Sequence, residues 1–191
     1  MEHALRGTGA CCAGHSVFLT APVKRLNDLD LQRFQFSGTK GEKIAQGQNP
    51  ANQKKQVVAW AEDVVSRMGD KVSGRKRDKF NTACVAFDET TGELYFGRNG
   101  GVDRFGPDLH DDIKKLLPSK PLNDYPTSWN CAETDAINNA LHAGAKLEHL
   151  QIYTISTRPK SFGTNKSSCQ NCTYMYKGRI SKNNTGWFKE D

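Results

Sequence analysis

Two short cysteine motifs restrict the folds open to this chain more than any other feature of its sequence. The first, at residues 131–133, has the pattern C-x-E, and the second, at residues 169–172, has the pattern C-x-x-C. Three thiolates that leave a fourth position open are a ligand set typical of catalytic zinc. If Cys131, Cys169 and Cys172 bind one metal ion, the fold has to bring two segments distant in sequence to one point.

Glu133 is the candidate catalytic residue of this site. It lies two residues after the first thiol, where a carboxylate can act as general acid and base for a metal-activated water without being a ligand. The pattern of residues 133–143 predicts a helix on which Glu133 shares a face with Ala136, Ile137 and Ala140. A carboxylate on an apolar face costs free energy unless it has a partner or a task, so the pattern favours a functional role.

The two motifs together resemble those of the cytidine deaminase superfamily, which hold zinc with three Cys or with His and two Cys beside a glutamate that is not a ligand. The chain is most similar to the deaminase domains of bacterial polymorphic toxins, such as the YwqJ-like group. The resemblance extends over residues 53–182 in the order of elements and is sharp only at the motifs. Two departures stand out: Ser168 replaces a common Pro, and Cys131 replaces the His of most polynucleotide deaminases.

The resemblance implies an α/β, three-layer fold with a mixed sheet of four to five strands, a hairpin first and helices on both faces. It implies one Zn²⁺ per chain and the hydrolytic deamination of cytosine to uracil in a polynucleotide, with single-stranded DNA preferred. Glu133 would take a proton from the activated water and return it to the base. Because the target atom is out of reach inside a stacked duplex, a single strand or a flipped nucleotide is implied.

Other functions remain open at this stage. The enzyme could act on free cytidine or a free nucleotide, because C-x-E also occurs among nucleoside-level members of the superfamily. Adenine and RNA are further alternatives that the sequence does not separate from cytosine and DNA. A more distant alternative is a structural zinc module closed by His142 or His149, which leaves Glu133 without a role.

Positive charge is the main sequence sign of a nucleic-acid partner. The 191-residue chain has a net charge of +6 and an isoelectric point of about 9.0, which fits a phosphate-bearing partner but is common in proteins without one. Residues 71–79 carry five cations and predict a loop at the pocket mouth, where Arg75, Lys76 and Arg77 are candidate phosphate contacts. A solvated loop is the alternative. A second polar loop at residues 158–166 adds further cations beside the site.

Five residues near the predicted strands and motifs are further candidates for substrate contact. Asn81 and Thr82 begin the first predicted strand and either bond the sugar or base or are ordinary strand-edge residues. Trp129 either stacks on a base or packs on the core. Ala132 adjoins Glu133, and Ser168 is the predicted N-cap of the helix that carries the second motif.

The order of predicted elements supports one α/β domain. The spacing of apolar residues, with Gly and Pro at the ends of elements, predicts a helix at 53–68, then a hairpin of strands at 81–87 and 93–97, and then a short helix at 109–117. The helix at 133–143 follows, then a strand at 149–157 reached by a parallel crossover, and one strand after residue 178. Residues 1–50 are predicted to be an extension or linker, and residues 51–191 the deaminase domain. Cys84 lies in an apolar run and is predicted to be an inert core thiol.

The expected cellular location of the protein follows from two sequence features that are not found in the chain and from the resemblance to toxins. The chain has neither the long apolar run of a membrane span nor the apolar segment of a signal peptide, so it is expected to be soluble, with no membrane partner. The toxin resemblance implies a secreted or delivered effector that acts in the cytoplasm of a target cell. It also implies a cognate immunity protein as a partner.

Overall fold

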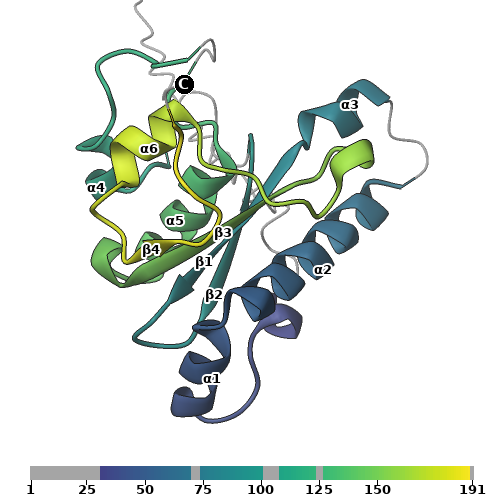
Figure 1. The fold of residues 1–191 in the computed structure, drawn as a ribbon, viewed down its shortest axis with the longest axis vertical. Helices are drawn as coiled ribbons and strands as arrows, with labels where there is room; N and C mark the ends of the chain where they lie inside the picture. The colour runs from purple at the N-terminus through teal and green to yellow at the C-terminus, as the bar shows by residue number, and fades with distance from the viewer. Residues whose placement is uncertain (1–30, 70–73, 101–107, 124–126, 190–191) are drawn as a thin grey trace, which may run out of the picture.

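A four-stranded mixed sheet separates two layers of helices in the computed structural model of the chain (Figure 1). The structure describes residues 31–69, 74–100, 108–123 and 127–189. The element order and layers match the predicted three-layer α/β fold. Within the described residues no helix is both long and apolar enough to cross a membrane.

The sheet has the strand order β2-β1-β3-β4. The central strand β1 (Thr82–Asp88) is antiparallel to β2 (Leu94–Arg98) and to β3 (Leu150–Ser156), and β3 is parallel to β4 (Lys182–Asn183). Because β2 and β3 both oppose β1, they run in the same direction. The chain passes from one to the other through helix α5 (Ala132–His142). The predicted hairpin, mixed sheet and parallel crossover are confirmed.

One face of the sheet is covered by helix α2 (Pro50–Met68), which begins at the Asn49 cap and ends at Gly69. Apolar residues at helical spacing bury Val57, Trp60 and Val64 against the sheet. The Trp60 ring stacks on Phe96 at 5.4 Å between centroids. The helix predicted from residue 53 is therefore confirmed, and its packing holds the sheet without touching the site.

The other face carries α5 and helix α6 (Gln170–Tyr176). Strand β1 is buried along its whole length because its alternate side chains enter two different cores. Val85 and Phe87 pack on the α2 side, whereas Cys84 and Ala86 pack on the side of α5 and α6. The prediction that Cys84 is a buried core thiol is confirmed.

Gly97 lets α5 lie directly on strand β2. A Cβ atom at Gly97 would lie 2.2 Å from the backbone nitrogen of Ala136 and 2.5 Å from the backbone oxygen of Ala132. Both are backbone atoms of α5, so no side-chain rotation could make room. This close approach fixes the first turn of α5, which carries Glu133, against the sheet.

The packed unit begins well before residue 51, where the sequence places the domain boundary. Residues 31–34 form a 3₁₀ turn, and helix α1 (Lys40–Gly47) follows, with a capping box between Thr39 and Glu42. Phe34 and Phe36 are buried in the α2-side core. Phe34 and Phe36 have the spacing of strand residues, but the alternation is too short to predict a strand, so their burial is a tertiary effect that the pattern does not reveal. Residues 1–30 lie outside the described residues.

The basic segment predicted as a loop is partly helical. Helix α3 spans Gly74–Lys79, in keeping with the good helix propensity of Arg and Lys. Arg77 is not a free surface cation, because its guanidinium donates to the backbone oxygens of Phe80 at 2.9 Å and Thr157 at 2.7 Å. The segment is therefore not wholly a loop, and Arg77 has backbone partners, whereas its contact with phosphate stays a prediction. The side chains of Arg75 and Lys76 lie outside the described part of the structure.

Three short elements complete the described fold. Helix α4 (Asp111–Lys114) begins at the His110 cap and is shorter than the predicted helix at 109–117. Single 3₁₀ turns precede and follow β3 at Leu147–His149 and Pro159–Ser161. The late strand expected after residue 178 is β4.

Replacing Gly97 by Ala should destabilise the fold, because the added methyl group meets the backbone of α5. We expect a loss of about 3 kcal/mol in the free energy of unfolding, at the upper end for overpacking. Gly41→Ala is the matched control, since a Cβ there meets nothing within 4 Å and lies in α1. It should stabilise the chain by about 0.5–1 kcal/mol. Urea unfolding of both variants measures the difference, and equal stability would contradict the close packing.

Candidate metal centre and its pocket

Three sulfur atoms meet where the first turns of α5 and α6 come together. The Sγ atoms of Cys131, Cys169 and Cys172 all lie within 4.8 Å of one another, and those of Cys131 and Cys169 are 3.2 Å apart. Cys131 is the N-cap residue of α5 and Cys169 is the N-cap residue of α6. Helix N-termini carry partial positive charge, which favours thiolates. The fold thus brings the two predicted motifs together.

The charges of the three thiols fit a bound metal cation. Hydrogen bonds from the thiols of Cys131 and Cys172 lower the pKa of Cys169 to about 3. The hydrogen bond to Cys169 raises the pKa of Cys131, and burial raises that of Cys172. One thiolate therefore forms readily, while further ionisation needs a neutralising cation. A Zn–S bond of about 2.3 Å places sulfurs about 3.8 Å apart in a tetrahedral site, close to the observed spacing.

Ser168 precedes α6 by two residues and is not its N-cap, contrary to prediction. The cap position belongs to Cys169, whose backbone is extended with φ −73° and ψ 173°. The backbone N–H of Ser168 instead donates to the oxygen of Gly186 at 3.0 Å, which holds Ser168 in the preceding segment. Its buried hydroxyl accepts a hydrogen bond from Asn183 Nδ2 at 2.9 Å and bonds Glu133.

Glu133 is a buried carboxyl group with only 3% of its surface exposed. Burial, together with the neighbouring Cys169 thiolate, raises the pKa of Glu133 to about 7. The hydrogen bond with Ser168 and the positive charge of Lys166 act in the opposite direction. A carboxyl group that titrates near neutral pH is suited to both accepting and donating a proton. The predicted role of Glu133 thus has the expected electrostatic setting.

A pocket opens beside Glu133 and two of the sulfurs. It has about 540 Å³ of empty space, part of which is open solvent. Its lining consists of Asn81, Thr82, Asn99, Thr127, Asn130, Cys131, Ala132, Glu133, Lys166, Ser167 and Cys169.

The structure separates the candidate contacts of the sequence into two groups. Asn81, Thr82 and Ala132 line the pocket together with Glu133. Trp129 instead packs against the core on the side of α5, which was the alternative to base stacking. Ser168 stands behind Glu133 and outside the lining.

Asn99 and Lys166 are pocket residues that were not among the candidate substrate contacts, although Lys166 belongs to the polar loop that the sequence places beside the site. Asn99 Oδ1 accepts the backbone N–H groups of Asn81 and Thr82, each at 3.0 Å, so it shapes the start of β1. Lys166 Nζ donates to Thr82 Oγ1, which in turn donates to Asn81 Oδ1 at 2.8 Å. In the sequence, Asn99 has only the signature of a turn and Lys166 that of a polar loop.

A second set of polar groups supports the sulfurs from within the core. The Tyr176 hydroxyl donates to Thr134 Oγ1 at 3.2 Å, and this oxygen lies 4.0 Å from the sulfur of Cys172. Asp135 accepts the backbone N–H of Arg98 at 2.9 Å, which ties the first turn of α5 to the end of β2. These contacts limit the movement of both helix starts.

Neither histidine of the structural zinc alternative joins the sulfur cluster. His142 lies at the far end of α5, exposed, with Nε2 2.9 Å from the backbone oxygen of Asp108. His149 lines a separate hollow near the turn of the β1–β2 hairpin. A Cys₃His site closed by either residue is therefore contradicted. Among the described residues the cluster offers three donors.

The raised pKa of Glu133 predicts how pH affects the metal-free protein. Between pH 4.5 and about 7 the carboxyl ionises in the unfolded chain but stays protonated when folded, so folding stability falls as pH rises through this range. Glu133→Gln removes this loss. At pH 8 with a chelator present, we expect the variant to be more stable than wild type by about 3 kcal/mol, at 1.36 kcal/mol per pKa unit.

At pH 4.5 most of this difference should disappear. Urea unfolding at the two pH values measures it, and Glu148→Gln, at an exposed residue, is the control that should show no pH-dependent gain. A gain at Glu133 that is the same at both pH values would contradict the shifted pKa.

Comparisons with protein-family models, curated proteins and solved structures give no match for this chain. The resemblance to the cytidine deaminase superfamily therefore depends on the C-x-E and C-x-x-C motifs. The geometry adds an independent observation, namely a pocket in which two of the three sulfurs and a buried carboxyl group meet.

Proposed function

We propose that the chain is a zinc-dependent deaminase that converts cytosine to uracil in a polynucleotide. The observation that carries the proposal is the position of Glu133, which is buried beside the sulfur cluster and lines the same pocket as Cys131 and Cys169. A purely structural metal site needs no buried carboxyl group at its open side. Hydrolytic deamination needs a proton carrier at that point.

Cys131, Cys169 and Cys172 would hold the metal ion, for which zinc is the best chemical fit because all three donors are thiolates. When bound, zinc supplies Lewis acidity that lowers the pKa of water at the open coordination position. The remaining chemistry depends on residues of the chain.

Glu133 would move the protons of the reaction. Its carboxylate accepts a proton from the water that adds to C4 of cytosine and delivers one to ring nitrogen N3. Glu133 then takes the second proton, from the hydroxyl group now on C4, and passes it to the amino group. The C4–N4 bond breaks, ammonia leaves, and C4 becomes the carbonyl carbon of uracil. The hydrogen bond from Ser168 holds the carboxyl group in place for these transfers.

The polar lining at the start of β1 would orient the base. Asn81 and Thr82 present an amide and a hydroxyl to the pocket, and Asn99 and Lys166 hold them there. A base enters this pocket only when it is outside a stack, so single-stranded DNA is the preferred substrate.

Free cytidine is the second candidate substrate. It is favoured by the pocket lining, because among the described lining residues none has an aromatic ring on which neighbouring bases could stack. The similarity to toxin domains extends the main proposal to a delivered effector with a cognate immunity protein.

The metal proposal predicts about one zinc per chain. Cys169→Ser should lose most of it, because a site with three protein ligands has no spare donor. Cys84→Ala is the control, since Cys84 is a buried thiol in the core and not part of the cluster. Elemental analysis after dialysis measures both. Full zinc retention in Cys169→Ser would remove this residue from the site.

Glu133→Gln should abolish deamination while zinc content and fold are preserved. A carboxamide has nearly the size of a carboxylate but does not accept and return a proton, so we expect a loss of about 10⁴-fold in kcat. The assay sequences oligonucleotides after incubation and counts C-to-T changes in DNA, with matched RNA and free cytidine as parallel substrates.

Glu148→Gln is the matched control and should keep wild-type activity, since Glu148 is exposed in the 3₁₀ turn before β3. In bacteria, expression of the wild-type chain should be toxic and expression of Glu133→Gln harmless. Near wild-type turnover by Glu133→Gln with zinc in place would refute the proposed mechanism.

A further inference from the structure

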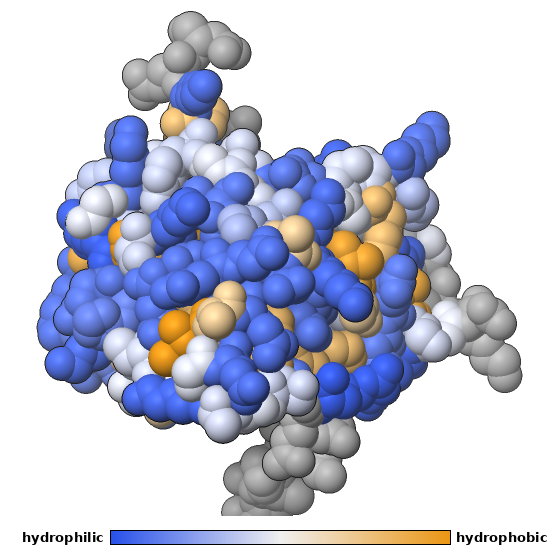
Figure 2. All heavy atoms as spheres, turned by 60° about the horizontal axis from the view of Figure 1, so that its bottom comes forward, coloured by the Kyte–Doolittle hydropathy of each residue, from blue (hydrophilic) through white to orange (hydrophobic). Residues whose placement is uncertain are grey.

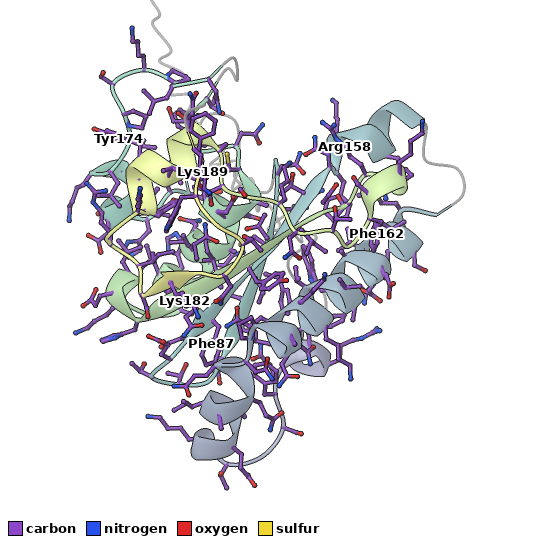
Figure 3. All side chains as sticks on the ribbon, in the orientation of Figure 1. Phe87, Arg158, Phe162, Tyr174, Lys182 and Lys189 are labelled. Carbon is purple, nitrogen blue, oxygen red and sulfur yellow. The ribbon has the colours of Figure 1, made fainter. Side chains whose placement is uncertain are left out.

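Three cations, Lys79, Arg158 and Lys166, lie at the end of the sheet where β1 begins and β3 ends. Among the described residues none of them forms an observed ion pair, and the charge of Lys166 also acts on the Glu133 carboxyl group across the pocket. Lys166 lines the pocket and is half-buried, whereas Lys79 and Arg158 are exposed and outside the pocket lining. Figure 3 shows Arg158 beyond the end of β3, beside α3. In the described residues, the observed ion pairs of basic side chains involve other cations: Arg33, Lys43, Arg67, His110, Lys114 and Lys115.

Hydrogen bonds of backbone atoms connect the segments that carry Lys79 and Arg158 to the pocket residues Asn99 and Asn81. The backbone oxygen of Lys79 accepts the side-chain amide of Asn99, which itself lines the pocket. Next to Arg158, the N–H of Thr157 donates to the oxygen of Asn81 at 3.1 Å. Lys79 is thus itself bonded to the pocket wall through its backbone, and Arg158 is one residue from a group that is.

Arg77 joins the two segments that carry these cations. Its guanidinium bridges the backbone oxygens of Phe80 and Thr157, which are the neighbours of Lys79 and Arg158. The hydroxyl of Thr157 adds a second link, donating to the Phe80 oxygen at 2.7 Å. Lys79 and Arg158 therefore start from backbone positions that are held together, which reduces the entropy lost when both bind one ligand.

Lys166 is oriented both at its backbone and at its ammonium group. Its backbone N–H bonds the oxygen of Thr154 at 3.0 Å, and its ammonium group donates to Thr82 Oγ1. An ammonium group has three N–H donors, and the bond to Thr82 uses one of them. A half-buried cation facing a polar pocket suits an anionic group of the substrate.

We propose that Lys79, Arg158 and Lys166 form a phosphate-binding edge for single-stranded DNA, with Lys166 contacting a phosphate of the nucleotide whose base enters the pocket. The proposal rests on the proposed function, because it takes the pocket as the site of the base. It extends that function by favouring a polynucleotide over free cytidine. A chain with several phosphates can contact all three cations, whereas a nucleoside contacts none of them through phosphate.

The opposite end of the sheet provides a control with the same charge. Lys182 on β4 pairs in register with Gln151 near the start of β3, and Lys146 precedes the 3₁₀ turn that leads into β3. Both lysines are exposed. Lys182 lies well away from Arg158 in Figure 3, and Figure 2 shows that one face of the molecule is largely hydrophilic. Because both control lysines are exposed, we expect their replacement by Ala to leave the fold intact.

The test measures binding of fluorescein-labelled single-stranded DNA containing one cytosine, by anisotropy over a range of salt concentrations. All proteins carry Glu133→Gln and are loaded with zinc, so no turnover occurs. Each phosphate contact to a single strand contributes about 0.7 to the slope of log Kd against log salt. Adding Lys79→Ala and Arg158→Ala should lower the slope by about 1.4, and Lys146→Ala with Lys182→Ala should leave it unchanged.

Lys166→Ala should lower the slope by about 0.7, and Lys166→Arg should restore it, since both side chains are cationic. Circular dichroism confirms that each variant is folded, and the exposed pair Lys79 and Arg158 tests the edge even if Lys166→Ala does not fold. Equal slopes for the two double variants would overturn the proposal, because binding would then depend on net charge alone. Matched single-stranded RNA and duplex DNA serve as parallel ligands, and tighter binding of duplex would also overturn it.

The experiments give different results if the phosphate-binding edge is wrong and if the proposed deaminase function is wrong. If the wild-type chain deaminates the oligonucleotide but the two double variants bind alike, the edge is wrong and the function stands. If no substrate is deaminated but the double variants differ as expected, the proposed function is wrong and the phosphate-binding edge stands.

Discussion

The meeting of two helix N-termini at three sulfur atoms is the constraint on which the rest of this structure depends. Cys131 and Cys169 each cap a helix, and Cys172 lies one turn into the second helix. This arrangement places partial positive charge from two helix starts on thiols that would otherwise be costly to ionise inside a protein. It also determines where Glu133 lies, because that residue is in the first turn after Cys131.

The position of α5 follows from a single residue without a side chain. Gly97 allows the backbone of α5 to contact β2, and Asp135 adds a hydrogen bond to the end of the same strand. The pocket wall opposite is the start of β1, whose geometry depends on Asn99. Strand β2 therefore positions the carboxyl group on α5. The polar wall is formed by the start of the neighbouring strand β1, which is buried on both faces.

Basic side chains near the pocket occur in two different environments. Arg77 is a structural cation whose guanidinium donates to the backbone oxygens of Phe80 and Thr157 and so joins the two segments that carry them. Lys79 and Arg158 are exposed cations on the segments that Arg77 joins. Composition counts these residues equally, and only the hydrogen bonds in the structure distinguish a cation that stabilises the fold from one that is exposed to solvent.

The sequence by itself determined the elements with strong local signals: the helix from residue 53, the hairpin, the α5 helix and the two cysteine motifs with Glu133. Periodicity, turn residues and metal-ligand spacing are local properties, so they can be identified before the fold is known. The burial of Phe34 and Phe36, the anchoring of Arg77 and the positions of Asn99 and Lys166 in the pocket were decided only by the tertiary structure. Each depends on a partner distant in the chain, and no pattern of neighbouring residues encodes which distant groups will meet.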